Sequence, residues 1–588
     1  MGTRFPNTMN WLTWSDEAFA QAREQNRPLF LVIGASWCRW CRDLEQKVLN
    51  DERVKDLLSE RFVSVKVDKD RRPDLDARYS RGGWPTLAWL DDTGELVAAE
   101  TYLEADELLE KLTTIADFYA ANRDTIREEL AERAQSAADE AQRARESKIA
   151  GGPALSEDVA RHVAETVLAT ADKVHGGWGK QQKFPHPEAI DFALIRWSET
   201  GDGEMLNMAL STLRHMQAGE IHDRTDGGFY RYAGRADWSV PHHEKTLDAN
   251  AQCLFVYLDA YQATGEQSFR ATAEGIIAWM ESTLRDPKTG AWRGSQDADP
   301  TYAHLASAEE RRAHGAPPCD PTIFTNGNAM GISAFLKAAV VLERDHLRDR
   351  ALNVLDFLLA ELLDERIGLH HYWDGTCQLP GLLTDQAYTL RALVDAMQFT
   401  GETRYLEPAQ RLAEMTIERL QSAGGGFFDI PRTPGAQGGL ARRDRSILEN
   451  STMAEALLRL SHMAWNPDYA EKARETVEAF LPEYKRYGHY VASYARAVNL
   501  FFHEPLHVTV LGRRSDPATN ALARAALSPY VASRIVQVLD PQEDAALCKR
   551  RGLCLPEQAQ ARAYVHRGRK SYAETSDPVR LPALMART

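Results

Sequence analysis

The chain has 588 residues, 44% of them hydrophobic, and a formal charge of −15 at pH 7. This length predicts about three or four domains with ample apolar side chains for buried cores, and the acidic balance argues against a nucleic-acid or anionic-membrane binder. No apolar run reaches the roughly 18 residues of a membrane helix, and the first residues lack the pattern of a secretory signal. Seven cysteines in 588 residues suit a reducing compartment. We therefore expect a cytoplasmic protein without membrane or nucleic-acid partners.

The first 121 residues alternate between helical and strand patterns. We expect helices over 16–25, from the dithiol to about 60, and over 104–121, and strands over 28–34, 62–67, 85–90 and 96–99. This order is that of a thioredoxin-like domain, which we assign to residues 1–121.

A Cys-x-x-Cys motif, Cys38 and Cys41, lies between the first apolar strand and a helical pattern. At such a junction the first thiol lies near unpaired amide N–H groups and the positive end of the helix, which favour the thiolate. Arg39 and Arg42 add positive charge. The motif therefore predicts a dithiol that exchanges with disulfides.

Pro85 opens a second apolar run about forty residues later. A proline at this place can adopt the cis form and lie against the dithiol, although sequence cannot show a cis bond. The alternative is half a zinc site or a pair of buried thiols. No second Cys/His pair lies nearby, so we predict neither a metal nor another cofactor.

Residues 122–153 are rich in Glu, Arg, Ala and Gln, and they predict a solvated helical linker. From 154 to 503, paired helical stretches alternate with glycine-aromatic loops. These loops lie at 176–179, 226–232, 290–294, 368–373 and 424–429, with a weak sixth at 487–490. Six such hairpins predict an all-α (α/α)6 toroid, with inner helices starting near 187, 245, 326, 384, 449 and 489.

Polar residues gather at these helix starts, and aromatic residues gather in the loops between them. If the toroid forms, both sets converge on one end of the barrel, where helix N-termini present free N–H groups. A sugar can stack on the faces of aromatic rings, and its hydroxyl groups can form hydrogen bonds with carboxylates and amides. We expect a sugar-like ligand to contact Trp178, Phe184, His186, Tyr230, Trp238, Asp297, Asp299, Asp385, Phe428, Glu449 and Asn450. The alternative is that the polar residues only cap helices.

Proton transfer at this end is expected of His242, His243 and Glu244, with Asp248 as a partner. Histidine takes and returns protons near neutral pH. The alternative role is loop anchoring through ion pairs with Lys245 or Arg231. The Asp-x-Asp at 297–299 is too little for a cation site.

Residues 504–588 form a predicted small α/β appendage, with strands at 506–512, 534–539 and 563–565 and a helix over 518–527. Cys548 and Cys554 lie six positions apart on an expected loop. They can form a disulfide, serve the dithiol, or be idle thiols.

Several motifs resemble a known family. They are 10–14 (Asn-Trp-Leu-Thr-Trp), 33–41, 65–68, 72–76 and 82–85 in the first domain, and 183–185, 226–232, 238–245, 296–299 and 424–429 in the barrel. The chain thereby resembles proteins that fuse a thioredoxin domain to a six-helical-hairpin barrel, namely the spermatogenesis-associated thioredoxin-like proteins and their bacterial relatives. The resemblance implies a barrel of the class of N-acylglucosamine 2-epimerase-like and glycosidase-like enzymes, which use His pairs or paired carboxylates.

The chain departs from the family at the dithiol, where Arg39 and Arg42 replace the usual histidine. It also departs from ordinary thioredoxins, which have a buried acid where this chain has Val32. In the appendage, His566 and Ser571 stand where the family often has a Cys pair.

We therefore expect a multidomain protein in which a thioredoxin-like dithiol domain, active in exchange or redox sensing, is fused to a barrel that binds or processes a carbohydrate. Its expected partners are a sugar-like small molecule and a disulfide-containing protein or thioredoxin-type reductant. One alternative is a carbohydrate epimerase or hydrolase with a non-catalytic thioredoxin-like domain. The other is a binding protein without turnover.

Overall fold

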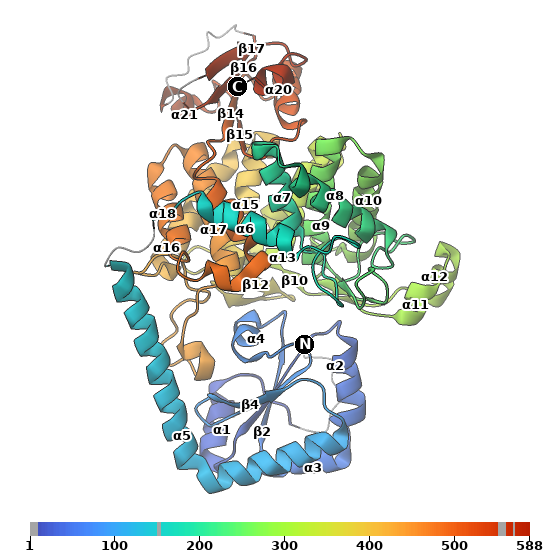
Figure 1. Cartoon of the computed structure of the whole chain (residues 1–588), viewed down its shortest axis with the longest axis vertical. Coiled ribbons are helices and arrows are strands. Elements are labelled where there is room, and N and C mark those ends of the chain that lie inside the picture. The colour runs from blue at the N-terminus through green and yellow to red at the C-terminus, as the bar shows by residue number, and fades with distance from the viewer. Residues whose placement is uncertain (1–9, 150–153, 551–559, 569–570, 588) are drawn as a thin grey trace. The chain divides into compact units, whose positions relative to one another are not determined.

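The structure is a computed structural model of the whole chain that describes residues 10–149, 154–550, 560–568 and 571–587. It divides into two compact units (Figure 1). Residues 1–152 and 430–444 form the first, called here the dithiol unit, and residues 153–429 and 445–588 form the second, called the barrel unit. In the described part of the chain, no helix combines the length and apolar character that crossing a membrane requires.

The dithiol unit contains a four-stranded sheet in the order β2-β1-β3-β4, with β1 parallel to β2 and antiparallel to β3. Its strands are β1 (Leu29–Gly34), β2 (Val63–Asp68), β3 (Thr86–Leu90) and β4 (Leu96–Glu100). Its helices are α1 (Asp16–Gln25), α2 (Arg39–Asp43), the π-helical η1 (Leu44–Val48), α3 (Glu52–Arg61), α4 (Pro73–Tyr79) and α5 (Ala105–Ile149).

Both faces of β1 are buried, so the strand is apolar throughout. Phe30 and Val32 pack on the side of α3 and α5, while Leu31 and Ile33 pack on the side of α1 and α4. The thioredoxin-like fold predicted from the sequence is confirmed.

The predicted closing helix and the predicted linker form one assigned helix, α5, with a kink at Asn122. Just beyond the kink, Arg123 and Arg127 both pair with the buried carboxylate of Asp92, with an Arg123 Nη2–Asp92 Oδ2 distance of 2.6 Å. Ile126 and Leu130 are also buried. Packing in the dithiol unit thus continues to about residue 130.

A segment from the middle of the barrel sequence, residues 430–444, belongs to the dithiol unit. The hydroxyl of Tyr79 accepts a hydrogen bond from Gly439 N at 2.6 Å and donates to Gly94 O. Arg78 Nε donates to Gly439 O at 2.8 Å. The contact is so close that a Cβ at Gly438 would lie 2.6 Å from the Tyr79 hydroxyl.

In the barrel unit, six inner helices form a closed ring, because each packs on the next and the last packs on the first. In ring order they are α7 (Pro187–Thr200), α9 (Leu247–Thr264), α13 (Thr325–Val341), α15 (Leu383–Thr400), α17 (Ile447–Ala464) and α19 (Ala492–Asn499). These starts lie within three residues of the predicted ones. The (α/α)6 toroid predicted from the sequence is confirmed.

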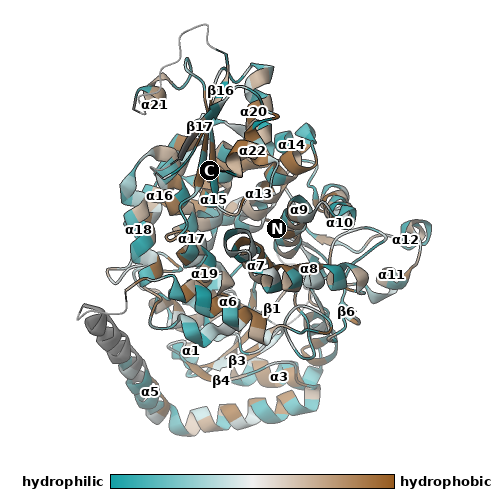
Figure 2. Ribbon diagram, turned by 45° about the horizontal axis from the view of Figure 1, so that its top comes forward, coloured by the Kyte–Doolittle hydropathy of each residue, from teal (hydrophilic) through white to brown (hydrophobic). Residues whose placement is uncertain are grey.

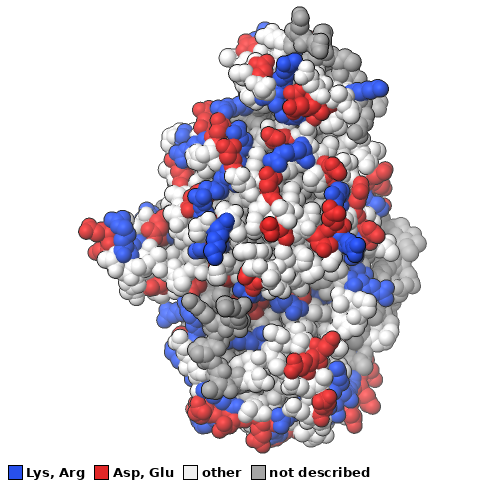
Figure 3. Space-filling view, turned by 180° about the vertical axis from the view of Figure 1, so that it is seen from behind, with Lys and Arg blue, Asp and Glu red and all other residues white. Residues whose placement is uncertain are grey.

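Six outer helices cover the ring, and each packs most extensively on one inner helix. They are α8 (Gly203–Ala218), α10 (Gln267–Trp279), α14 (Asp345–Phe357), α16 (Leu406–Leu420), α18 (Pro467–Glu478) and α6 (Asp158–Thr170). In Figure 2, α18 is drawn mainly in teal, as expected of an outer helix that presents a polar face. On the surface seen in Figure 3, acidic and basic side chains are interspersed.

The appendage has a four-stranded sheet in the order β15-β14-β16-β17. Its elements are β14 (Leu506–Leu511), α20 (Pro517–Leu527), β15 (Arg534–Leu539), α21 (Ala545–Arg550), β16 (Arg562–Arg567), β17 (Ser571–Thr575) and α22 (Leu581–Met585). The first two strands are parallel and the last two antiparallel, as in the dithiol unit. The appendage thus repeats the order and directions of the thioredoxin-like sheet, and it has a fourth strand, β17, that the sequence did not predict.

Candidate functional site

The dithiol lies at the start of α2, where Cys38 is the N-cap residue. The backbone N–H of Cys41 donates to Cys38 Sγ at 3.3 Å, and the Cys38 thiol lies 3.7 Å from the carbonyl oxygen of Trp84. The Trp84–Pro85 bond is cis, which was expected as a possibility for this proline. Cys38 is 6% exposed. The first sulfur is therefore held between a helix N-terminus and the cis-proline loop, with a small part of its surface open.

Cys41 is placed differently from Cys38. Its sulfur points back at the end of β1, so closely that a Cβ at Gly34 would lie 3.4 Å from it. Burial raises the pKa of the Cys41 thiol far above its usual range, and the hydrogen bond to Cys38 and the negative charge on Cys38 raise it further. Cys41 therefore holds its proton strongly. The two sulfurs thus lie in different environments.

A polar and aromatic layer surrounds the dithiol. The indole N–H of Trp37 donates to Asp70 Oδ2 at 2.6 Å, and that of Trp84 donates to Asp76 Oδ1 at 2.7 Å. Lys69 Nζ lies 5.4 Å and 4.7 Å from the centres of these two rings. Trp40, in contrast, is 50% exposed. Two tryptophans beside the dithiol are thus held by hydrogen bonds, whereas the ring of Trp40 is half-exposed.

Val32 is buried in the sheet, and its partner across β2 is Lys66. Lys66 Nζ lies 2.5 Å from Glu45 Oε2, and both side chains are largely buried. Burial lowers the pKa of Lys66, while Glu45, and Cys41 when it is ionised, act in the opposite direction. A Glu45–Lys66 ion pair thus lies near Cys41, while Val32 occupies the position of the missing acid. The sequence signals that could have revealed it are the spacing of four residues from Cys41 to Glu45 and a lysine on a buried strand.

At the barrel end, most polar residues at the helix starts hold the loops. Four amide side chains share one arrangement, in which the side-chain oxygen accepts from a loop N–H and the side-chain nitrogen donates to the C=O of the same loop residue. The pairs are Asn250 with Phe229, Asn328 with Trp292, Gln386 with Leu369, and Asn450 with Phe427, with N–H to oxygen distances of 2.7, 2.9, 2.9 and 2.6 Å. Asn450 is thus fully engaged with the loop.

Asp385 and the two predicted tryptophans are likewise engaged inside the protein. Asp385 is fully buried and lies 3.0 Å from Nδ1 of His371, which is a partner that the sequence did not predict. The indole of Trp178 donates to Val167 O at 3.0 Å, and that of Trp238 donates to His175 O at 2.8 Å. Neither tryptophan is exposed to solvent.

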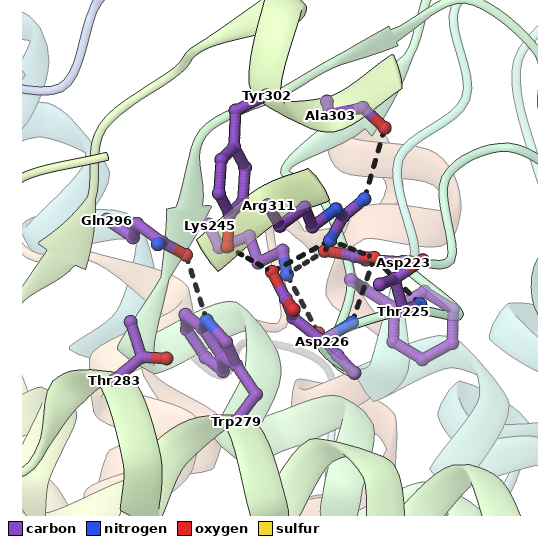
Figure 4. A network of polar contacts seen from close by, with 12 residues as sticks. Asp223, Thr225, Asp226, Lys245, Trp279, Thr283, Gln296, Tyr302, Ala303 and Arg311 are labelled. Atoms are coloured by element: carbon purple, nitrogen blue, oxygen red, sulfur yellow. Dashed lines mark hydrogen bonds and ion pairs between the residues drawn. The ribbon is translucent and has the colours of Figure 1, made fainter. Parts of the chain in front are cut away.

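A buried charge network, shown in Figure 4, joins the loop before α9 to a chain excursion containing α11 (Pro300–His304) and α12 (Ala308–His314). Lys245 Nζ lies 2.5 Å from Asp223 Oδ2. Arg311 Nη1 lies 2.8 Å from Asp223 and 2.7 Å from Asp226, which also accepts from the Tyr302 hydroxyl. Lys245 therefore serves as a loop anchor here.

The other residues predicted near this network have local partners. Tyr230 is buried, with Lys245 Nζ 5.2 Å from its ring centre. Asp299 caps α11 by accepting from Tyr302 N at 3.0 Å. The backbone N–H of Asp297 donates to Pro318 O.

The predicted acid–base group separates into individual environments. Glu244 is buried and accepts from Arg231 Nε at 2.7 Å. The His243 ring packs on Tyr230 and His304, and burial, with His304, lowers the pKa of His243 to about 4. Asp248 is exposed on the first turn of α9. His242 lies in a third environment, where its Nε2 is 2.8 Å from the hydroxyl of Tyr232.

His242 is one end of a contiguous set of rings that we call the aromatic–histidine cluster. The rings stack from His242 on Tyr232 (4.0 Å between centres) and from Tyr232 on Phe184 (4.7 Å). The cluster continues through His186, His489 and Tyr490. Of the residues predicted to bind ligand, the structure brings Trp178, Phe184 and His186 together with His242. Trp178 is buried and stacks on His489 with 5.7 Å between ring centres.

The aromatic–histidine cluster combines open rings with hydrogen-bonding groups. Phe184 is 37% exposed and Tyr490 is 55% exposed. His186 Nδ1 lies 3.1 Å from Glu188 Oε1, and burial, with His186, lowers the pKa of His489 to about 4. Tyr232, His489 and Tyr490 were not among the predicted site residues, and the weak sixth loop at 487–490 was the signal for two of them. Phe428 and Glu449 are partly buried.

Comparisons with known proteins agree with the motifs. Residues 3–138 match a family described as "Thioredox_DsbH: Protein of unknown function, DUF255". Spermatogenesis-associated protein 20 of Homo sapiens is 26% identical over 719 residues, covering 98% of this chain and 90% of that protein. Disulfide bond reductase DsbH of Chlamydia pneumoniae is 26% identical over 102 residues, covering 15% of this chain and 61% of that protein. The resemblance predicted from the motifs is thus confirmed.

Solved structures also resemble part of the chain. A D-mannose isomerase is 12% identical with a TM-score of 0.48, covering 60% of this chain and 100% of that one. Cellobiose 2-epimerase from Bacillus thermoamylovorans is 12% identical with a TM-score of 0.46, covering 55% of this chain and 86% of that one. Scores this low support no inference about the ligand of the barrel.

Proposed function

We propose that the dithiol unit reduces disulfides, with Cys38 as the nucleophile and Cys41 as the resolving thiol. The observation that carries this proposal is the unequal placement of the two sulfurs. Cys38 accepts a backbone hydrogen bond at the helix start, whereas burial and Cys38 keep Cys41 protonated. Such a pair performs thiol–disulfide exchange in two ordered steps. The similarity to a protein named disulfide bond reductase supports the direction of reduction.

In the first step, the Cys38 thiolate attacks one sulfur of a client disulfide. A bond forms between Cys38 and that sulfur, the client S–S bond breaks, and the other client sulfur leaves as a thiolate that takes up a proton. In the second step, Cys41 loses its proton and attacks Cys38. The Cys38–Cys41 bond forms and the second client thiolate leaves. The client gains two electrons, and a thioredoxin-type dithiol of a reducing compartment such as the cytoplasm restores the reduced pair.

We assign the proton of Cys41 to the Glu45–Lys66 pair. Glu45 lies one helical turn after Cys41, and its carboxylate is 2.5 Å from the ammonium group of Lys66. Lys66 in turn interacts electrostatically with Cys41. A carboxylate so placed takes the proton during resolution, while Lys66 balances the negative charge that passes to Cys41. Glu45 thereby fills the role that Val32 cannot.

The test uses the full chain, reduced and then freed of reductant, mixed with oxidised glutathione. We expect one glutathione disulfide to be reduced per chain, and peptide mass spectrometry to find the Cys38–Cys41 disulfide. The Cys377→Ser variant, which removes a thiol on β13 (Cys377–Pro380), should behave like the wild type. Unchanged glutathione disulfide after complete prior reduction would reject the activity.

A second function is supported by a separate observation, the exposed rings of the aromatic–histidine cluster. Phe184 and Tyr490 offer ring faces, while His242 and Glu188 offer hydrogen-bonding atoms beside them. Open aromatic faces next to a few polar groups suit a sugar-like ligand. We propose that the cluster binds such a ligand. Proton transfer, as in an epimerase or hydrolase, would rest on His242, since Glu244 is paired with Arg231 and His243 packs elsewhere.

Calorimetric titration with mannose, glucose, cellobiose and N-acetylglucosamine tests this second proposal. We expect Phe184→Ala to weaken binding at least tenfold. The control Phe502→Ala removes a phenylalanine that is 40% exposed and should change nothing. Absence of binding to all four sugars would count against the site. If NMR shows that a bound sugar is converted, loss of conversion in His242→Ala would identify an enzyme, and its retention would refute the role of His242.

A further inference from the structure

Two exposed arginines lie on the two segments that meet at Cys38, residues 36–43 and 78–85. Arg39 directly follows Cys38 and begins α2. Arg81 precedes Trp84 by three residues, and the carbonyl oxygen of Trp84 lies 3.7 Å from the Cys38 sulfur. Both arginines are exposed to solvent. A client that reaches Cys38 therefore approaches a surface that carries an exposed positive charge on each of the two segments.

Neither of these two arginines has a carboxylate partner in the described part of the chain. Arg81 donates from Nη1 to the backbone carbonyl oxygens of Ser80 and Arg78, at 2.8 Å and 3.3 Å. A carbonyl group accepts a hydrogen bond without neutralising the charge of the donor. The side chain of Arg39 makes neither an ion pair nor a hydrogen bond with the described residues. Both guanidinium groups are therefore available to an anionic group of a client.

The acidic side chains nearest the dithiol are engaged inside the dithiol unit. Asp43 lies 3.3 Å from Lys47 Nζ. Three further carboxylates accept hydrogen bonds from residues at the dithiol, namely Asp68 from Ser36 N, Asp70 from the Trp37 indole and Asp76 from the Trp84 indole. These contacts direct the negative charges toward the protein. The charges that face a client from the two segments therefore include Arg39 and Arg81 without a matching acid.

Trp40 and Glu104 limit how strongly this surface distinguishes clients by charge. Of the two residues between the cysteines, Arg39 is charged and Trp40 is not. The Trp40 ring packs edge-on against Tyr102, with 5.5 Å between ring centres. The exposed side chain of Glu104 lies beside Tyr102. Because Glu104 and the net charge of −15 repel anions, we expect a moderate preference that depends on direct contact with the arginines.

We propose that the dithiol selects disulfides flanked by carboxylates, as in an acidic segment of a protein client, and that Arg39 and Arg81 bind these carboxylates. This inference rests on the proposed reduction of disulfides and names its substrate class. Guanidinium groups bind carboxylates through charge-assisted hydrogen bonds. The bonds that form and break are those of the exchange at Cys38, and the two arginines position the client without taking part in that exchange.

The test compares three peptide disulfides that differ in charge. They are the disulfide-linked dimers of the acetylated and amidated tripeptides Glu-Cys-Glu, Gln-Cys-Gln and Lys-Cys-Lys. The reduced full chain is mixed with each dimer at low ionic strength. Each rate is divided by the rate at which dithiothreitol, which carries no charged group besides its reacting thiolate, reduces the same dimer at the same pH. This division removes the intrinsic reactivity of each disulfide.

We expect the normalised rates to fall in the order Glu, Gln, Lys. The Glu-to-Lys ratio should be about tenfold, because the exposed arginines act through water and with opposite sign on the two dimers. Sodium chloride at about 0.5 M should lower this ratio to roughly twofold, since salt screens exposed charges.

Two substitutions assign the preference to its residues. Arg39→Gln and Arg81→Gln should each lower the Glu-to-Lys ratio about twofold or more, and the double variant should bring it to about one. The rate with the uncharged Gln dimer should stay near that of the wild type in all three variants. The control Arg23→Gln changes an exposed arginine on α1, which precedes the start of β1, whereas Cys38 follows its end. This control should keep the wild-type ratio.

The outcomes separate this inference from the proposed function. Equal normalised rates for the three dimers, or reduction of glutathione disulfide but of none of the dimers, would overturn the selection of acidic clients and leave disulfide reduction in place. An unchanged ratio in the double variant would overturn the role of the two arginines. A chain that reduces neither the dimers nor glutathione disulfide would reject the proposed function and this inference with it.

Discussion

Two sheets of this protein share one strand order and differ in the residues that come directly after their first strand. After β1 the chain continues into Trp37, Cys38 and the start of α2, and the sulfur of Cys38 lies at the helix start. After β14 it continues into Arg513, Arg514 and the cap of α20, Asp516. The same place in the topology thus carries a dithiol in one case and arginines in the other.

After β14, the arginine side chain of Arg514 makes structural contacts within the barrel unit. Arg514 pairs with the buried carboxylate of Asp544 and also donates to Gly401 O at 2.8 Å and Thr403 Oγ1 at 2.9 Å, at the turn between α15 and α16. It therefore fastens the appendage to the ring of helices. The comparison shows that the same strand order places a side chain after the first strand in both sheets. The type of side chain at that position, a cysteine or an arginine, then determines its function.

The largest expected effect separates the two sheets by reactivity. Cys38→Ser should abolish glutathione disulfide reduction, lowering its rate at least 1,000-fold, because no other described thiol lies at a helix start beside the cis-proline loop. Cys548→Ala removes a buried thiol of the appendage and should leave the rate within twofold. The rate is measured as glutathione thiol released over time. Equal loss of this rate in the two variants would contradict a special reactivity of the dithiol.

The next effect concerns the contact of Arg514 that holds the appendage on the ring of helices. Arg514→Ala should lower the free energy of unfolding of the appendage by about 3 kcal/mol, because it leaves the buried charge of Asp544 unpaired. Faster hydrogen exchange at β14 and β15 would show it. Arg39→Ala, which removes an exposed arginine after β1, should stay within about 0.5 kcal/mol in the same measurement. Unchanged exchange at β14 in Arg514→Ala would refute the fastening role.

A third effect tests whether ion pairs of Asp223 with Lys245 and Arg311 stabilise the fold, as the ion pair of Arg514 does. Burial raises the pKa of Asp223, but Lys245 and Arg311 outweigh it and bring the pKa down to about 2, below the ordinary 3.8. A lowered native pKa gives stability that is present above about pH 4 and is lost as the pH falls toward 2. The loss amounts to about 2 kcal/mol. Denaturant unfolding between pH 5 and pH 2 should show it in the wild type and a flatter profile in Asp223→Asn. Parallel profiles would contradict the assignment.

The smallest effect concerns the proton of Cys41. Glu45→Gln should slow resolution of the Cys38 mixed disulfide about tenfold at pH 7, which is less than the roughly hundredfold or greater effect typical of a general base. Because the pKa of Cys41 is raised, the deficit should shrink as the pH rises and hydroxide replaces the base. Glu52→Gln, on exposed α3 surface, serves as the control. A deficit that is the same at pH 7 and pH 9 would indicate a structural role for Glu45.

Local signals explain what the sequence predicted well. Cys38, Cys41 and Pro85 are adjacent to apolar strands, so their placement follows from neighbours in the chain. The ring also follows from local patterns, because each hairpin repeats the same turn signals. The described structure does not include Cys554, so the predicted relation between it and Cys548 lies outside the described residues. Cys548 itself is buried in the appendage.

Tertiary contacts explain what the sequence could not predict. Asn450 and Asp385 stand at helix starts, as a ligand-binding residue would, but their partners are the backbone of Phe427 and the ring of His371, which only folding brings near. The Glu45–Lys66 pair joins a helix to a strand across 21 positions. β17 is short and polar, so it has no apolar alternation to reveal it.

The central claim, that Cys38 attacks and Cys41 resolves, is tested most directly by trapping. The Cys41→Ser variant should accumulate a mixed disulfide between Cys38 and glutathione, seen as an added glutathione mass on the intact chain and on the peptide of Cys38. The double variant Cys38→Ser with Cys41→Ser should accumulate none. A trapped adduct in Cys38→Ser alone, on Cys41, together with its absence in Cys41→Ser, would contradict the account.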